Sequence, residues 1–429
     1  MNPIERGLAT LCRFIILLGL SLPLYLGIAH GLLDLDQNPV LRSALAGAFL
    51  IHVWTRPRAA QWMASVAMGL VASAAYASMH HGFGNYPGAA PATCASFAGL
   101  ASLLILAAQS LLGKPAERPE YRKTLWTAAA FPYFSFVMAL ALNLTSAQHP
   151  RVYDLWLYAF DETLKIRPSF LIGHLTANAA LLEDAARMAY ESLPLVICWL
   201  AALERRSPEK FSARVIPLFV TAGLAGVFLY QFLPAVGPAY IFGNKFPESL
   251  PALSGVAIQP MLLPRVARNA MPSVHFACAL LVWWNTAAFG RVWRALAVAY
   301  VAMIFLATMG FGEHYLVDLV VAVPFALALQ AGCLKAAWGS TARRRALWGS
   351  VVLTAGWIGA LRTSLFQGSF VLSWCAVSAT VALTLWWKRG LDLCLRGEDI
   401  AEIPDHQPGV PVVDPADQIG AVQAHANAR

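Results

Sequence analysis

Two histidines and one aspartate stand at spacings suited to nucleophilic and acid–base chemistry. His275 closes the stretch RNAMPSVH, and His314 and Asp318 lie four residues apart in GFGEHYLVD. Residues four apart share one face of an α-helix, about 6 Å apart along its axis. A carboxylate so placed can accept a proton from one imidazole nitrogen, which fixes the tautomer and leaves the other nitrogen free to attack.

The residues around these histidines can bind an anion. Each histidine opens an apolar segment, and a helix N-terminus offers unpaired N–H groups and partial positive charge, which suit phosphate. Ser273 can cap its helix or donate to a phosphate oxygen, and Arg268 can supply a full positive charge. A nucleophile, its orienting group, a second acid–base group and an anion-binding group are a minimal set for phosphoryl transfer without a metal. We therefore predict His314, His275 and Asp318 as catalytic residues, with no metal and no cofactor.

The composition places these residues in a membrane. The 429-residue chain is 58% hydrophobic and 13% charged, whereas soluble globular chains carry about 25% charged residues. One water-soluble core cannot hide that much apolar surface, so the bilayer is the expected solvent. The net charge of +8 is expected to face anionic lipid from cytoplasmic loops and does not indicate nucleic-acid binding. The seven cysteines are isolated and predict neither a disulfide framework nor a metal site.

About twelve segments approach the roughly 20 apolar residues that cross a bilayer. They centre on residues 12–32, 41–54, 62–79, 94–112, 124–145, 187–204, 214–233, 273–289, 293–310, 314–334, 346–361 and 369–387. We therefore predict an all-α, polytopic membrane helix bundle. Basic residues fall in alternate loops, as the positive-inside rule requires. This pattern predicts a multi-pass cell-membrane protein with both termini cytoplasmic and both histidines at one depth on the extracytoplasmic side.

Two long segments lie on the predicted outer side. The first, residues 146–186, contains Tyr153–Phe160 and, at its end, Leu175–Arg187. Both stretches are typical of amphipathic interfacial helices. Residues 234–270 are rich in Pro and Gly, which predicts an ordered, non-helical cap with a functional role. After about residue 390 the chain is polar and contains several prolines, which predicts a disordered cytoplasmic tail.

The two motifs resemble those of a known enzyme family. Residues 272–275 (PSVH) and 314–318 (HYLVD) are similar to the second and third motifs of the phosphatidic-acid phosphatase type 2 superfamily. The tyrosine of HYLVD and the upstream PAVGPAY at 234–240 look like the branch that includes inositol phosphorylceramide synthase and sphingomyelin synthase. The resemblance covers about residues 124–335. It implies additional spans at 1–123, a six-span catalytic core at 124–335, further spans at 336–390 and a tail at 391–429.

The resemblance implies a role for each motif residue. His314 would be the nucleophile that forms a phosphohistidine, and Asp318 would orient it. His275 would protonate the leaving oxygen, and Ser273 would bind phosphate.

The chain departs from the family pattern at two points. The first motif, Lys followed after six residues by Arg-Pro, is absent from the loop before residue 271, and Ala307–Thr308 stand where Ser-Arg usually precedes the third motif. Phosphate-binding groups are therefore missing or replaced. We predict Arg268 and Lys245 as the replacements.

These features predict a membrane enzyme whose substrate is a lipid phosphate, lipid diphosphate or phospholipid entering from the outer leaflet. A water acceptor would make it a phosphatase, and an alcohol acceptor would make it a phosphotransferase. Two other interpretations stay open. Twelve spans with polar residues also suit a transporter, although no inverted repeat is visible. His275, His314 and Asp318 also match a two-histidine, one-carboxylate metal triad of a hydrolase. No sequence feature indicates an oligomeric state.

Overall fold

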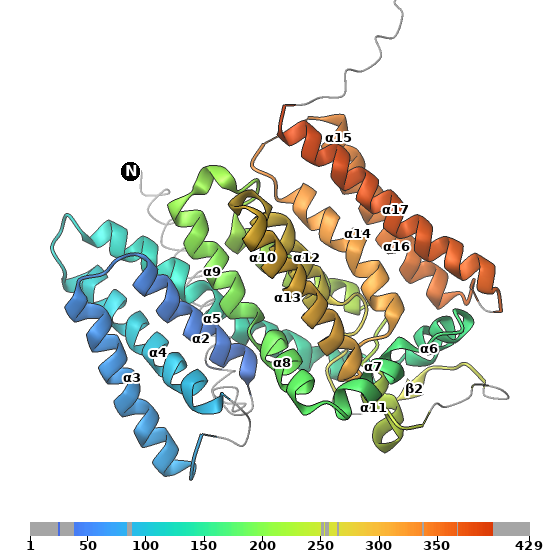
Figure 1. The fold of residues 1–429 in the computed structure, drawn as a ribbon, viewed down its shortest axis with the longest axis horizontal. Coiled ribbons are helices and arrows are strands. Elements are labelled where there is room, and N and C mark those ends of the chain that lie inside the picture. Colours follow the sequence, from blue (N-terminus) through green and yellow to red (C-terminus); the bar gives the residue numbers. More distant parts are fainter. Residues whose placement is uncertain are drawn as a thin grey trace, which may run out of the picture.

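The chain folds as a bundle of helices. The computed structural model describes residue 25 and residues 38–83, 88–249, 253, 257–263, 266–336, 339–366 and 368–397. Within these ranges the only sheet pairs two short antiparallel strands, β1 (Arg151–Val152) and β2 (Met261–Leu262) (Figure 1). The helical content confirms the all-α part of the predicted membrane bundle.

The N-terminal helices form one side of the bundle (Figure 1). They are α2 (Pro39–Trp54), α3 (Ala59–Met79), α4 (Ala89–Leu112) and α5 (Arg118–Gln148). Helix α2 packs against α4 and α5, and it also contacts α9 of the following segment. The predicted first span at 12–32 lies almost entirely outside the described residues.

The central part of the chain contains the two motifs. Its helices are α6 (Asp154–Thr163), α7 (Pro168–Ala177), α8 (Ala180–Glu191), α9 (Leu193–Arg206), α10 (Val215–Tyr230), α11 (Pro238–Phe242), α12 (Val274–Thr286), α13 (Arg291–Gly310) and α14 (Leu316–Gly332). Short turns of 3₁₀ helix are η1 (Pro208–Lys210), η2 (Gly243–Lys245) and η3 (Ala287–Phe289). The C-terminal part adds α15 (Thr341–Arg344), the π-helical η4 (Arg345–Gly349), α16 (Ser350–Arg362) and α17 (Phe370–Leu395).

Five described helices are long and apolar enough to cross a membrane: α3, α4, α5, α13 and α17. A sixth span results if α8 and α9, which are bent by 51° at their junction, count as one. Helices α2, α10, α12 and α14 are apolar but shorter. The structure therefore supports a multi-pass membrane protein but not the predicted count of about twelve. Hydropathy measures how apolar a run is, and it does not say whether the backbone continues as one helix.

The outer segments differ from the sequence prediction in their boundaries. The predicted stretch at 153–160 is helix α6, which continues to Thr163. The predicted helix at 175–187 is instead split between α7 and α8, with Asn178 and Ala179 outside both helices. The segment at 234–270 was predicted to be non-helical, but it contains α11 and η2. Helix α17 continues to Leu395, and the predicted tail beyond residue 397 lies outside the described residues.

Helix α14 lies at the centre of the bundle and is buried along almost its whole length. It packs against α10, α12, α16 and α17 along the bundle and against α6 at one end. A helix that is apolar all round is expected in a protein core or in lipid, and α14 occupies the core. The large apolar core contains residues of α9, α10, α12 and α14. A second core, at the end where α6 meets α14 and α16, surrounds the start of α14. The start of α14 is therefore held on several sides.

The close approach of α2 and α4 predicts the effect of one substitution. A Cβ built on Gly99 would overlap the carbonyl oxygen of Leu45, so Gly99→Ala must push the two helices apart. Overpacking of this kind costs about 1–3 kcal/mol. We expect a lower midpoint of thermal unfolding in detergent, measured with purified protein. The control Gly356→Ala in α16 meets no atom within 4 Å and should leave the midpoint unchanged or slightly raised. Equal midpoints for the two variants would contradict the close packing.

Candidate functional site

Chain topology brings the two predicted catalytic histidines to the same end of the bundle. His275 lies in the first turn of α12, α13 ends at Gly310, and His314 precedes α14 by two residues. Helix α12 contacts both α13 and α14. The two rings are close enough for a charge on His314 to lower the pKa of His275.

The His314 ring is oriented by two acceptors. Its Nδ1 lies 2.8 Å from the carbonyl oxygen of Ala270 and 3.4 Å from Oδ2 of Asp318. A carbonyl oxygen can only accept, so Nδ1 carries the proton and Nε2 is the unprotonated nitrogen. The sequence pattern suggested Asp318 as the orienting group, but the backbone carbonyl is the closer partner. No pattern in the sequence points to that carbonyl, because it comes from a loop 44 residues upstream.

Asp318 ties the start of α14 to the start of α12. Its Oδ2 accepts the backbone N–H of Tyr315 at 2.8 Å, and its backbone carbonyl accepts the N–H of Ser273 at 3.3 Å. The Ser273 hydroxyl in turn caps α12 by accepting the N–H of Phe276. Asp318 is fully buried, and its Oδ1 has no hydrogen-bond partner among the described residues. One buried carboxylate oxygen therefore remains available within the cluster.

His275 lies in an aromatic environment and is partly exposed. Its ring stacks on Tyr190, with ring centroids 4.1 Å apart and planes 14° apart. Tyr190 meets Phe311 edge to face, and the Arg187 guanidinium lies 4.9 Å from the centroid of the Phe311 ring. Arg187 also pairs with Glu183 at 2.6 Å. This cation is thus linked to His275 through two aromatic rings.

The two predicted replacement phosphate ligands do not join the histidines. The Arg268 guanidinium donates to the backbone carbonyls of His149, Val266 and Leu263, so its nitrogens hold the loop that leads to Ala270. Lys245 is exposed in η2. Among the described residues, no hydrogen bond joins it to His275 or His314.

The N-terminus of α14 is occupied by carboxylates of the chain itself. Asp161 accepts the N–H groups of Leu316 at 2.8 Å and Val317 at 3.4 Å, and Asp318 accepts that of Tyr315. These are the N–H groups that we expected to be open to phosphate, so that expectation was wrong for α14. Sequence analysis missed Asp161 because its segment was assigned to a membrane interface.

Burial changes the protonation of groups at this end of the bundle. Burial lowers the pKa of His314 to about 4, against which the nearby Glu313 charge and the Ala270 hydrogen bond act only weakly. His314 is therefore neutral at physiological pH and can act as a base or nucleophile. Burial also raises the pKa of Glu313, whose carboxylate accepts a hydrogen bond from Tyr240 at 3.1 Å.

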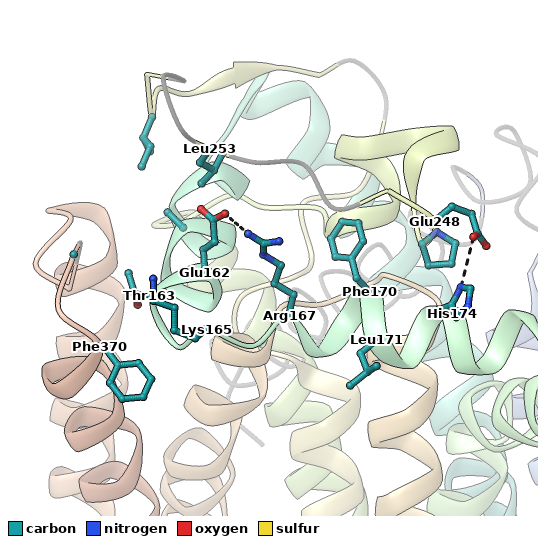
Figure 2. A pocket seen from close by; sticks show the side chains of 14 residues that line it. Glu162, Thr163, Lys165, Arg167, Phe170, Leu171, His174, Glu248, Leu253 and Phe370 are labelled. Atoms are coloured by element: carbon teal, nitrogen blue, oxygen red, sulfur yellow. Dashed lines mark hydrogen bonds and ion pairs between the residues drawn. The ribbon is translucent and has the colours of Figure 1, made fainter.

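A large cavity lies beside this site and does not contain it. Its volume is about 860 Å³, and it is lined mainly by α6, α7 and the segment after η2. Figure 2 shows Arg167 paired with Glu162, and His174 paired with Glu248, within it. Phe170 lines the cavity and packs against the ring of Phe246. His275 and His314 are not among its lining residues.

The chain was compared with known proteins. Residues 155–332 match the family model of the PAP2 superfamily. The match includes both histidine motifs and supports a membrane enzyme of the phosphatase and phosphotransferase kind. It runs from the first turn of α6 to the last residue of α14, a shorter range than the predicted core at 124–335. Comparisons with curated proteins and with solved structures gave no match. Within the described residues, no three His, Cys, Asp or Glu side chains are grouped as a metal site requires.

The lowered pKa of His314 predicts a pH-dependent stability. Its ordinary pKa is 6.5, and in the folded protein it is about 4. Between these values the unfolded chain takes up a proton that the folded chain does not, so His314 makes the protein less stable as pH falls. We expect a smaller drop in thermal midpoint from pH 7 to pH 5 in His314→Asn than in the wild type. The control His81→Asn, at an exposed position, should keep the wild-type slope. A wild-type slope in His314→Asn would contradict the buried neutral imidazole.

Proposed function

We propose that the protein is an integral membrane lipid phosphatase or phosphotransferase that acts through a phosphohistidine on His314. The observation that carries the proposal is the 2.8 Å contact between His314 Nδ1 and the Ala270 carbonyl oxygen. A proton on Nδ1, directed at the Ala270 carbonyl, leaves Nε2 as an unprotonated nucleophile. The match of residues 155–332 to the PAP2 superfamily supports the same class of reaction.

The proposed first step forms one bond and breaks another. Nε2 of His314 attacks phosphorus, and the bond from phosphorus to the leaving oxygen breaks. Burial lowers the pKa of His275 to about 3 in the free protein, so in this proposal the ring takes up a proton together with the anionic substrate. It then gives that proton to the leaving oxygen. The positive charge that develops on the His314 ring is stabilised by Asp318, whose Oδ2 lies 3.4 Å from Nδ1. Partial exposure of His275 suits a residue that exchanges protons with a leaving group and with solvent.

The proposed second step regenerates the enzyme. The oxygen of water or of an alcohol attacks phosphorus, the bond from phosphorus to Nε2 breaks, and His275 takes the proton of the attacking oxygen. Water gives a phosphatase, and a lipid or polyol hydroxyl gives a phosphotransferase. The substrate is a lipid phosphate or phospholipid, because the site lies at one end of a bundle that otherwise exposes apolar surface along its helices.

Binding of the phosphoryl group requires positive charge or hydrogen-bond donors. Arg268 donates to three carbonyls, so in this proposal it positions the loop that carries Ala270. The partly exposed Arg187 lies against Phe311, which contacts the Tyr190 ring stacked on His275. It is the better candidate for the first phosphate contact. Ser273 remains the proposed hydroxyl donor, and Lys245 the proposed outer cation.

Loss of His314 tests the proposal directly. We expect His314→Ala to lower phosphate release or lipid product by at least about a thousandfold, because no other unprotonated nitrogen would occupy its place. Purified protein is incubated with labelled phospholipids and lipid phosphates, with and without alcohols, and products are identified by mass spectrometry. A phosphorylated His314 should be trapped by rapid quenching at alkaline pH.

Two controls separate this proposal from its alternatives. Chelators should not change the rate, whereas a metal-dependent hydrolase would lose activity. Liposomes that contain the His314→Ala protein should show no substrate-dependent flux. Such a flux would favour a transporter. Full product formation by His314→Ala, or a phosphorylated residue elsewhere, would end the proposal.

The role of His275 predicts a dependence on the leaving group. We expect His275→Asn to lower kcat by about 10²–10⁴ for a lipid alkoxide leaving group, because a general acid is lost. The loss should be much smaller for a p-nitrophenyl phosphate ester, whose leaving oxygen needs no proton. Equal losses for the two substrates, measured on the same preparation, would assign His275 to binding and not to proton transfer.

A further inference from the structure

We infer that Asp154 and Asp161 of α6 are positioning residues, which together hold the loop before α14 and the loop after α10 in the geometry that the His314 nucleophile requires. The inference rests on the proposed function. It adds two residues that no motif of the sequence analysis included, and it assigns a catalytic purpose to a helix that does not touch the histidines.

The two carboxylates share one face of α6. They are seven residues apart in DLWLYAFD, which is about two helical turns. Asp154 is fully buried, and Asp161 is 1% exposed. Helix α6 contacts α11, α14, α16 and α17, so this face is turned towards the start of α14 and the loops beside it.

Asp161 fixes the direction in which α14 begins. Its two carboxylate oxygens accept the N–H groups of Leu316 and Val317, from a position 155 residues earlier in the chain. These N–H groups have no partner within their own helix. Because His314 lies only two residues before Leu316, any rotation of this first turn would move the imidazole.

Asp154 holds two separate segments. Oδ1 accepts the N–H of Gly237 at 2.8 Å and the hydroxyl of Tyr315 at 3.1 Å, and both oxygens lie within hydrogen-bond range of the Val236 N–H. Gly237 has a φ of +103°, and a Cβ there would overlap the backbone of Glu313. The loop after α10 is therefore pressed against the residue that precedes His314, and Asp154 holds both sides of this contact.

The cost of burying these two acids is offset by the backbone N–H groups that they accept. Burying a carboxylate without an ion pair costs several kcal/mol unless hydrogen bonds compensate. Asp154 and Asp161 have no salt bridge among the described residues, and burial raises the pKa of Asp154 to about 7 and that of Asp161 well above its ordinary value. Apolar side chains at these positions would leave the buried N–H groups of both loops without acceptors. The two acids therefore satisfy this backbone and, by doing so, fix its direction beside His314.

Isosteric variants test the inference. Asp161→Asn and Asp154→Asn keep the volume but replace one acceptor oxygen by a donor. Asp161→Asn loses the hydrogen bond to one of its two backbone N–H groups, and Asp154→Asn sets an amide N–H against the Val236 N–H where Oδ2 lies 3.2 Å from it. We expect kcat to fall by about 10–100-fold, because a shift of about 1 Å at a nucleophile costs that much, while KM stays within about twofold. Asp184→Asn in α8, a partly exposed acid of the same type, should keep the wild-type kcat.

A second measurement does not depend on activity. Nitrogen-15 chemical shifts of labelled histidines report which ring nitrogen carries the proton, and the signal of His314 is identified by its absence in His314→Asn. We expect the Nδ1–H tautomer in the wild type and a mixture of tautomers in Asp154→Asn and Asp161→Asn.

The outcomes separate failure of the inference from failure of the proposed function. Unchanged kcat and an unchanged His314 tautomer in both variants would overturn the inference, even with the proposed function intact. A lower thermal midpoint with wild-type kcat per folded molecule would also overturn it, because the acids would then only stabilise the fold. Full activity of His314→Ala would instead overturn the proposed function, and a shifted tautomer would then still show that the acids orient this ring.

Discussion

The start of α14 is buried, and its free N–H groups must be satisfied inside the protein. A helix N-terminus has four such groups, and water cannot reach them here. Asp161 and Asp318 accept three of them, those of Tyr315, Leu316 and Val317. The position of the His314 ring follows from this constraint, because it is attached to the same turn and is held from the other side by the Ala270 carbonyl.

The two histidines have different surroundings, and these differences suit different roles. His314 is almost fully buried between a carbonyl and a carboxylate, and burial keeps it neutral. His275 is partly exposed and stacked on Tyr190. Burial also lowers the pKa of His275, so both rings are neutral in the free protein. The buried His314 ring suits nucleophilic attack, and the more accessible His275 ring suits proton exchange with a bound anion. The cluster is rich in carboxylates, and Arg268 is engaged by carbonyls. Under the proposed function, the partly exposed Arg187 is therefore the candidate cation for a phosphate.

The helices outside the matched segment serve the bundle in two ways. Helices α2, α4 and α5 pack on one another, and α2 and α5 also contact α9. Helix α9 contributes to the large apolar core and contacts α12. Helices α16 and α17 pack on α14, and both also contact α6. The C-terminal helices therefore cover the helix that carries Asp154 and Asp161. The N-terminal helices lie on the opposite side of the bundle (Figure 1).

The sequence alone determined the class of the fold and the location of the histidine pair. Apolar runs indicate helices in lipid. When three consecutive helices alternate in direction, the first and the third begin at the same end of the bundle. It also determined the His314–Asp318 pair, because a spacing of four is a local property of the helix. The number of spans was not determined in this way, since breaks such as that between α8 and α9 depend on packing.

Only the tertiary structure decided which groups orient the His314 ring. The Ala270 carbonyl, Asp154 and Asp161 come from segments 44 to 161 residues away from their partners, and no spacing rule connects such positions. The tertiary structure also placed the Arg268 guanidinium against backbone carbonyls. It supplied Asp161 and Asp318 as acceptors for the N–H groups at the start of α14. The physical reason is that hydrogen bonds of a buried loop are assigned by whichever groups the packed fold brings near, and local patterns carry no information about them.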